Sequence, residues 1–311
     1  MARPDGKGGT LPDIGWRCPS ATYWWKSGVW GPMLRHPAAA RGITSWISVV
    51  ALAALAFSGC GMSASRFGPH LRLTSEQAIS LLYNQGIAHV PGGWILSGTS
   101  LPFPKTDLLV RTDEHFHVLA EKRPAIPQPW RSEGYDHIGD IDVVGNVIYA
   151  PFEQPDYAKG YQATACFNAT TLAFIDAVVL PQHQNSFVAV DPRTMIAYSM
   201  NEFGGDSLLR YDVTHDWQPL PSLNLSELLR NTQGASIGDG YIWISTSDAH
   251  NDLYRVSLAS GKVTWIGHQG HPGGEGEGID VSSLPSGYIH AMVVDPNRLQ
   301  VWVENFDLTT G

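Results

Sequence analysis

The sequence predicts an all-β protein built as a five-bladed β-propeller, and three observations carry this prediction. A similar unit recurs five times along the chain. Each unit holds short segments in which apolar and polar residues alternate, enriched in β-branched and aromatic side chains and separated by Gly, Asp or Pro turns. The 311 residues include 32 Gly and 21 Pro and are only 16% charged, a composition that favours many turns over long solvated helices. Four strands per repeat at this period are typical of a propeller blade.

The strands can be assigned in order along each repeat. The first strands begin near Gln85, His137, Ser186, Gln233 and Glu277, so the spacing falls from 52 to 44 residues. The second strands read GGWILSG, GNVIYAP, TMIAYSM, GYIWIST and GYIHAMV. The third strands read DLLVRTD, TACFNATT, LLRYDVTH, LYRVSLASG and VWVENFDLTTG, and the fourth FHVLAEK, LAFIDAVVL, WQPLPSL and KVTWIGH. Aromatic residues recur in the second strands, and we expect them to pack between blades; they are Trp94, Tyr149, Tyr198, Trp243 and Tyr288.

The fifth repeat ends without a fourth strand, which predicts how the ring closes. Upstream of the first repeat, HLRLT alternates and has no partner of its own. We expect residues near 69–74 to pair with residues near 300–308, because this closure removes two exposed sheet edges. The next stretch, TSEQAISLLYNQ, is expected to form a short helix or an irregular first strand. A six-bladed ring, with a degenerate blade from residues 66–84, is the alternative.

The N-terminal region has the pattern of an export signal. Ile43 to Phe57 is an uncharged apolar run preceded by Arg35 and Arg41, too short to span a bilayer comfortably. It ends in FSGC at Cys60 and resembles the bacterial lipoprotein signal, which implies a lipidated (palmitoylated) cysteine at the mature N-terminus. An uncleaved anchor helix is the alternative. The expected organisation is a mis-annotated or disordered leader (1–32, with translation starting at Met1 or Met33), a signal peptide (33–59), a tether (60–68) and the propeller (69–311).

The charge distribution limits the partners of the body. The formal net charge is −9, although residues 1–59 carry six basic and two acidic side chains, so the body is strongly acidic. This argues against nucleic acid and against docking on anionic lipid, and it is compatible with cation binding. Cys166 is the one cysteine of the body, so we expect a buried core thiol and no disulfide within the body.

The body also resembles known propeller families. Its third strands, such as the FDLTTG end of the last repeat, resemble those of YVTN, NHL and SMP-30-like blades, and the count of five resembles the olfactomedin-type ring. The resemblance covers nearly the whole body and implies the fold. It also implies a metal in the central channel, as propellers of the olfactomedin and SMP-30 kinds often hold one there.

Polar residues on or beside the innermost strands are the candidate functional residues, because these strands line the channel. Converging carboxylate and amide oxygens would suit Ca²⁺, which takes six to eight oxygen ligands. The alternative is that Asp140, Asp142 and Asp280 only cap neighbouring turn amides. The candidate channel and metal residues are His137, Asp140, Asp142, Asn185, Gln233, Glu275, Glu277 and Asp280.

These features predict a binding module anchored by lipid to the outer face of a bacterial cytoplasmic membrane. Its partner would be a small ligand or an envelope protein at the channel mouth. The alternative is a metal-dependent hydrolase of the lactonase or esterase kind, because an acid, a base and a metal together support that chemistry. The sequence contains neither G-x-S-x-G nor H-E-x-x-H, so no catalytic residue is assigned and binding is favoured over catalysis.

Overall fold

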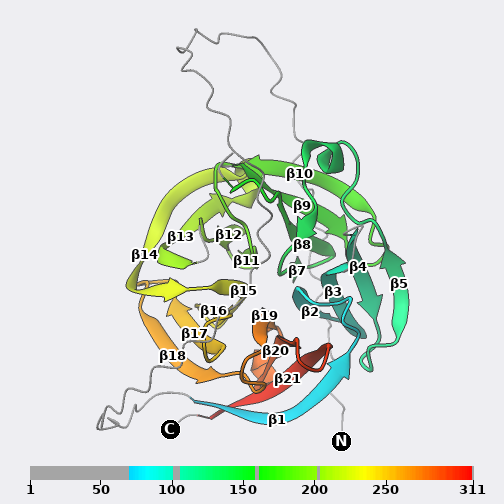
Figure 1. Ribbon diagram of the computed structural model, residues 1–311. Coiled ribbons are helices and arrows are strands. Elements are labelled where there is room, and N and C mark those ends of the chain that lie inside the picture. The colour runs from blue at the N-terminus through cyan, green and yellow to red at the C-terminus, as the bar shows by residue number, and fades with distance from the viewer. Residues whose placement is uncertain (1–69, 101–105, 158–160, 202–203, 310–311) are drawn as a thin grey trace, which may run out of the picture. The chain divides into compact units, whose positions relative to one another are not determined.

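The computed structural model describes residues 70–309, apart from 101–105, 158–160 and 202–203, as an all-β ring (Figure 1). The leader, the signal peptide, Cys60 and the tether lie outside the described residues. Short 3-10 turns are the only helical segments in the described part of the chain. None of its helices is long and apolar enough to cross a membrane.

Five antiparallel sheets form the ring, one for each predicted blade. Blade 1 is β2 (Gly86–Val90), β3 (Gly93–Ser100), β4 (Thr106–Thr112) and β5 (Val118–Lys122). Blade 2 is β6 (His137–Ile138), β7 (Asp142–Val144), β8 (Val147–Glu153), β9 (Gln162–Asn168) and β10 (Phe174–Leu180). Blade 3 is β11 (Ala189–Asp191), β12 (Ile196–Ser199), β13 (Gly204–Asp212) and β14 (Gln218–Arg230). Blade 4 is β15 (Thr232–Gly238), β16 (Tyr241–Thr246), β17 (Asp252–Ser257) and β18 (Val263–His268).

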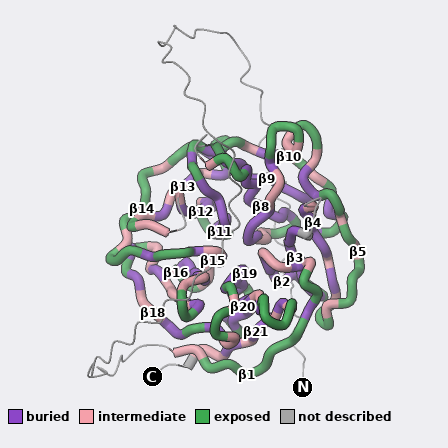
Figure 2. Tube along the Cα trace, in the orientation of Figure 1, coloured by how far each residue is buried: buried purple, intermediate pink, exposed green. Residues whose placement is uncertain are grey.

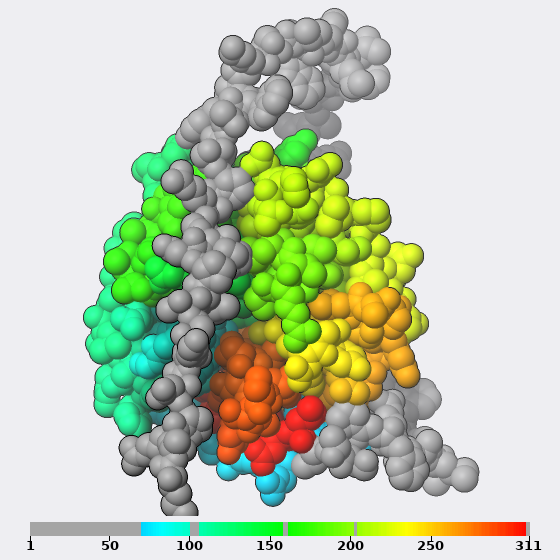
Figure 3. Space-filling view, turned by 180° about the vertical axis from the view of Figure 1, so that it is seen from behind, coloured from blue at the N-terminus to red at the C-terminus, as the bar shows by residue number. Residues whose placement is uncertain are grey.

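Blade 5 joins the two ends of the described chain. It consists of β19 (Glu275–Asp280), β20 (Tyr288–Asp295), β21 (Gln300–Thr309) and, on the outside, β1 (His70–Ile79). β1 runs antiparallel to β21, from His70 opposite Thr309 to Ile79 opposite Val301. Figure 3 shows the blue first strand beside the red last strand. The predicted closure is therefore confirmed.

The structure corrects two expectations around β1. Residues 74–79 continue the strand after a bulge between Leu73 and Ser75, so they form no helix and no first strand of a blade. The ladder with β21 supplies partners for backbone groups along the whole segment, which outweighs a weak helical preference. The six-bladed alternative is wrong, because the segment that would start a sixth blade completes the fifth.

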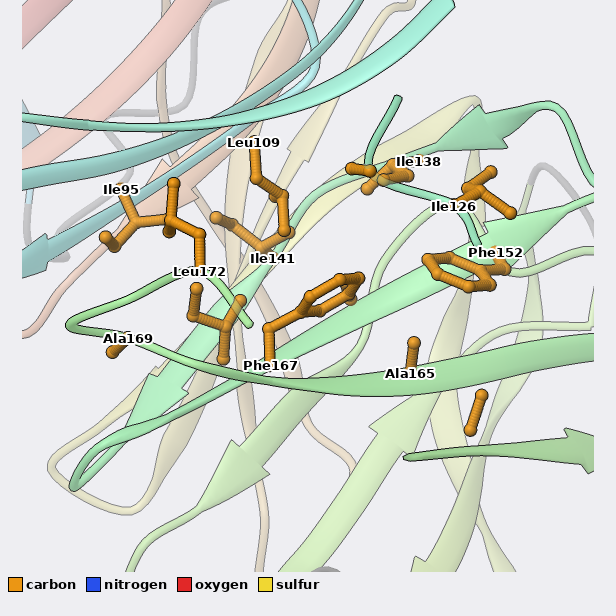
Figure 4. Close-up of a cluster of buried hydrophobic side chains, with 14 of the residues drawn as sticks. Ile95, Leu109, Ile126, Ile138, Ile141, Phe152, Ala165, Phe167, Ala169 and Leu172 are labelled. Atoms are coloured by element: carbon orange, nitrogen blue, oxygen red, sulfur yellow. The ribbon is translucent and has the colours of Figure 1, made fainter. Parts of the chain in front are cut away.

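The core lies between neighbouring blades, and the outermost strands are the most exposed (Figure 2). Figure 4 shows one such cluster, in which Ile95 and Leu109 of blade 1 pack near Phe152 and Phe167 of blade 2. Four of the five recurring aromatics are buried between blades as predicted; they are Trp94, Tyr149, Tyr198 and Trp243.

The fifth recurring aromatic was assigned wrongly. Tyr288 is 45% exposed. The buried position of this blade belongs to His290, two residues further along β20. Tyr288 points to the same face, but it is the first residue of the strand and lies at the exposed end of the blade. The His290 ring packs edge-on against Trp94 of blade 1 at 4.8 Å between centroids.

Cys166 is buried in the core between blades 2 and 3, as expected. The other cysteines of the chain, Cys18 and Cys60, both lie outside the described residues.

Glycines allow the innermost strands to meet at the ring axis. A Cβ on Gly278 would lie 2.6 Å from Asp140 Oδ1 and 2.8 Å from the Cα of Gly86. A Cβ on Gly234 would lie 2.8 Å from the Cα of Gly278. These glycines come from blades 1, 4 and 5, so backbone packs on backbone at the centre. The segment with alternating Gly and Glu residues, expected from the sequence to be a loop, is thus β19 itself, and Gly278 lies within it at this contact.

Candidate functional site

Asp140 occupies the middle of the ring and is 1% exposed. Its Oδ1 accepts hydrogen bonds from the N–H groups of Ile87 (3.1 Å) and Ile141 (3.0 Å). Its Oδ2 accepts from Ala235 (2.9 Å) and Ile279 (3.3 Å). One carboxylate therefore binds the innermost strands of blades 1, 4 and 5.

The backbone of Asp140 reaches the remaining blade. Its N–H donates to the Ser186 carbonyl at 2.8 Å, and its carbonyl accepts from Val188 at 3.4 Å. Burial raises the pKa of the Asp140 carboxyl well above its usual range, and the amide donors oppose that shift. Because both oxygens already accept two N–H groups, Asp140 is a structural junction between all five blades and is not available as a ligand.

Three other predicted residues also serve the scaffold. Asp142 accepts from the N–H groups of Val143 (2.8 Å) and Val190 (2.7 Å), which links blade 2 to blade 3. Asp280 accepts from the N–H and hydroxyl of Ser282. These carboxylates cap nearby backbone amides, as the alternative interpretation proposed. Asp140 and Asp142 also accept hydrogen bonds from backbone amides of other blades.

Asn185 is fully buried and engaged in hydrogen bonds. Its side-chain nitrogen donates to the carbonyl of Ala163 at 2.7 Å, and its Oδ1 accepts from Gln182 and from Ser199, each at 2.9 Å. Its backbone N–H donates to Glu153 Oε1 at 2.7 Å. Asn185 therefore helps to hold Glu153 in place, and it is not among the described lining residues of the pocket that contains Glu153.

The other four predicted residues come together at one end of the channel. They line a cavity of about 260 Å³, here called the mouth pocket. Its lining is Gln85, Asp136, His137, Glu153, Gln154, Pro155, Tyr157, Ser186, Gln233, Glu275 and Glu277. A second cavity of about 290 Å³ contains Asp142 and shares no lining residue with the first. Of the eight predicted residues, four thus line the mouth pocket, Asp140 forms the central junction and Asp142 lines the second cavity. Asn185 and Asp280 are in the described lining of neither cavity.

The mouth pocket is strongly acidic. It contains four carboxylates and one histidine, and no lysine or arginine is among its described lining residues. Burial raises the pKa of the Glu277 carboxyl well above its usual range, and the nearby charges of Glu275 and Asp140 raise it further. Burial also raises the pKa of Glu275. A positive charge placed here would oppose both effects, because it stabilises the ionised carboxylates.

Sequence reasoning missed part of this lining. Asp136 directly precedes β6, and Glu153, Gln154 and Tyr157 belong to the stretch FEQPDY at the end of β8. Among the additional polar residues, Gln85 and Ser186 had a signal, because they start the first and third repeats. A cluster of Glu, Gln and Asp directly after a second strand would have marked the others, because that strand end lies beside the start of the first strand.

The pocket does not contain a compact ligand cluster of the kind that the family resemblance implies. Among the residues that the structure describes, the single group of three acidic or histidine ligands within 4.8 Å of one another lies elsewhere, in blade 5. Asp140 and Asn185, two of the expected ligands, use their oxygens in hydrogen bonds. In the described part of the chain, the four carboxylates of the mouth pocket are therefore spread around the cavity and do not form one compact cluster.

Comparisons with known proteins support the fold. No protein-family model matches the chain, and no curated protein matches it in sequence. A glutaminyl cyclase from Myxococcus xanthus is similar in structure, with a TM-score of 0.54 and 12% identity over 78% of this chain and 98% of that one. A luciferin-regenerating enzyme matches with a TM-score of 0.47 and 9% identity over 70% of this chain and 74% of that one. At 12% identity, the similarity to the glutaminyl cyclase concerns the propeller fold alone.

Proposed function

We propose that this chain is an exported, lipid-anchored propeller that binds a positively charged small ligand, an organic amine or an amino terminus, in its mouth pocket. One observation carries the proposal: the described lining of the 260 Å³ mouth pocket includes four carboxylates and no lysine or arginine. Buried carboxylates repel one another at high cost, and a bound cation offsets that cost. The pocket is larger than a bare ion requires, which favours an amine.

A neighbouring cavity extends the surface that a ligand can use. This second hollow, of about 680 Å³, lies beside blade 3 and shares Tyr157 with the mouth pocket. Its lining also includes His183, Gln184 and Arg230. A peptide whose amino terminus enters the mouth pocket would pass Tyr157 and lay its following residues in this hollow. We therefore favour peptide amino termini over free monoamines as ligands.

Calorimetric titration can distinguish the cations. The purified protein is titrated with butylamine, with a short peptide, with the same peptide acetylated at its amino terminus, and with Ca²⁺. The proposal expects the free peptide to bind at least ~10-fold more tightly than the acetylated one, because acetylation removes the charge. Equal affinity for both peptides would contradict it. Binding of Ca²⁺ alone would instead support the calcium prediction.

A catalytic role on the same pocket is the second candidate. The similar structure from Myxococcus xanthus is a glutaminyl cyclase. Here burial raises the pKa of Glu277 well above its usual range, so it holds a proton more readily than an exposed glutamate does, which suits a general acid or base. Incubation with a peptide that begins with glutamine would test this, since cyclisation releases ammonia. Ammonia release that Glu277→Gln abolishes would favour the enzyme over the binding module.

The metal-dependent hydrolase is less well supported. That alternative needs three or more carboxylate or amide oxygens within metal distance, beneath an open pocket. The pocket is present. In the described parts of blades 1 to 5, however, no three acidic or histidine ligand atoms converge at the mouth. We therefore place an amine ligand ahead of metal-dependent hydrolysis.

A further inference from the structure

A second acidic cluster lies away from the channel, where the ring closes. Glu76 of β1 and Glu304 of β21 stand directly opposite each other in the antiparallel ladder. Like charges at such positions destabilise a sheet. His271, from the loop between β18 and β19, lies between them. Figure 1 shows how these three segments, from opposite ends of the chain, meet in blade 5.

The ligand atoms of the three residues converge. His271 Nε2 is 3.0 Å from Glu76 Oε2 and 3.8 Å from Glu304 Oε1, and all three atoms lie within 4.8 Å of one another. In a tetrahedral site with bonds of about 2.1 Å, ligand atoms are roughly 3.4 Å apart. The cluster therefore needs only small adjustments to surround an ion.

The cluster contains a buried oxygen without a partner. The Glu304 side chain is 0% exposed, and its Oε2 accepts from the Gly270 N–H at 3.1 Å. Its Oε1, which faces His271, has no hydrogen-bond partner. An unsatisfied buried carboxylate oxygen is costly, and it is the atom that a metal ion would bind. Gly270 leaves the required space, because a Cβ there would lie 2.5 Å from Oε1.

The surroundings hold the imidazole in place. The His271 ring stacks on Trp302 with centroids 4.8 Å apart and planes inclined by 15°. Its Nδ1 faces Asp295 Oδ2 at 3.7 Å, on the side away from the two glutamates. Metal-binding histidines commonly direct their second nitrogen to a carboxylate in this way, which fixes the tautomer and the ring orientation.

We propose that Glu76, His271 and Glu304 form a binding site for a divalent transition-metal ion, with Zn²⁺ the best match. One imidazole and two carboxylates suit Zn²⁺ better than Ca²⁺ or Mg²⁺, which prefer oxygen alone. The ion would tie β1 and β21, the two strands that close the ring, to the loop before β19. Its fourth position opens to water on the side of Glu76, whose side chain is 39% exposed.

Titration of the metal-free, full-length protein with Zn²⁺ tests the site. We expect one equivalent to bind, and Glu304→Gln or Glu76→Gln to weaken binding at least ~10-fold. Glu114→Gln is the matched control, because Glu114 also pairs with a histidine, His89 at 3.3 Å, but has no second carboxylate in the pair. This variant should bind Zn²⁺ like the wild type.

Two further measurements separate binding at this cluster from adventitious Zn²⁺ binding at surface histidines. Zn²⁺ should raise the melting temperature of the wild type and of Glu114→Gln, and of neither cluster variant. Co²⁺ substituted for Zn²⁺ should give the visible spectrum of a four-coordinate ion. The proposal is overturned if the wild type does not bind Zn²⁺, or if both cluster variants bind it within twofold of the wild type. If the buried substitution Glu304→Gln prevents folding, the half-exposed substitution Glu76→Gln still tests the site.

Discussion

Asp140 shows how one side chain can hold a ring of blades together. Its carboxylate accepts amides that are 53, 95 and 139 residues away in the sequence. The sequence predicted that this residue faces the channel, because it lies in a first strand. It could not predict the four donors, because their convergence depends on closing the whole ring.

Replacing Asp140 by asparagine should therefore be severe. The new NH₂ group would face N–H donors where the carboxylate now accepts them, for example from Ala235 and Ile279. We expect a loss of about 2–4 kcal/mol in the free energy of unfolding, measured by chemical denaturation. Asp113→Asn is the control: Asp113 caps only its own exposed turn, so its replacement should cost much less stability than that of Asp140. Equal losses would remove the special role of Asp140.

Gly278 should be equally intolerant of a side chain. A Cβ there meets Asp140 Oδ1 and the backbone of Gly86 and Ile87, each at less than 3.0 Å. Gly278→Ala should destabilise the protein by roughly 2–3 kcal/mol, a typical cost of overpacking. Gly205→Ala should be almost neutral, because its nearest atoms are 4.0 Å away. Thermal unfolding of both variants would check the difference.

Asp142 should make stability depend on pH. Burial raises its pKa to about 7 in the folded protein, from a usual 3.8. Between these values the folded state binds more protons than the unfolded state, so this group's contribution to stability falls as pH rises from about 4 to 7. The slope is at most about 1.4 kcal/mol per pH unit. Asp142→Asn should remove this contribution, so the free energy of unfolding should fall less steeply with pH in the variant than in the wild type. An unchanged slope would contradict a raised pKa at Asp142.

At the scale of elements, most of the fold could be predicted from local pattern. Alternation located the strands of all five blades, and the missing fourth strand predicted the closure by β1. The two wrong predictions concern segments where the residue pattern fits more than one structure or more than one register. Residues 74–79 carry both helical and strand signals, and the position of Tyr288 in its repeat could not be told from that of His290 without the register of β20.

The closure by β1 can be tested by moving that strand. Because β1 pairs antiparallel with the end of β21, a variant that begins at residue 81 and carries residues 70–80 after Gly311, joined by a short turn, should fold like the parent. Deleting residues 1–80 without replacement should abolish cooperative thermal unfolding, because it exposes the edge of β21. A deletion variant as stable as the permuted one would show that β1 is dispensable.

At the scale of the whole molecule, an acidic propeller is joined to a proposed membrane anchor. The anchor was predicted from Cys60 and the apolar run before it, and it remains a prediction. Cys60→Ala should release the protein from the membrane fraction of a bacterial host, because the lipid can no longer be attached. Unchanged retention would favour an uncleaved anchor helix. The control is Met62→Ala, which leaves the cysteine intact.

The mouth pocket was predicted in part, for physical reasons. His137, Gln233, Glu275 and Glu277 lie at strand starts, which the repeat pattern locates. The division between ligand-facing and scaffold carboxylates depends on which amides lie within hydrogen-bond distance of each carboxylate. That information is present only in the assembled ring, where the carboxylates of Asp140 and Asp142 accept hydrogen bonds from backbone amides of other blades.

Proton release on ligand binding tests the central claim most directly. The wild type and Glu277→Gln are titrated at pH 7 with a peptide amide lacking any acidic residue, in two buffers of different ionisation enthalpy. Because the pKa of Glu277 is raised well above its usual range, a cation in the mouth pocket should expel a proton from the wild type, and its affinity should rise with pH. Glu277→Gln should bind more weakly and release less. Binding without proton release, or equal release by both proteins, would contradict a cation site at Glu277.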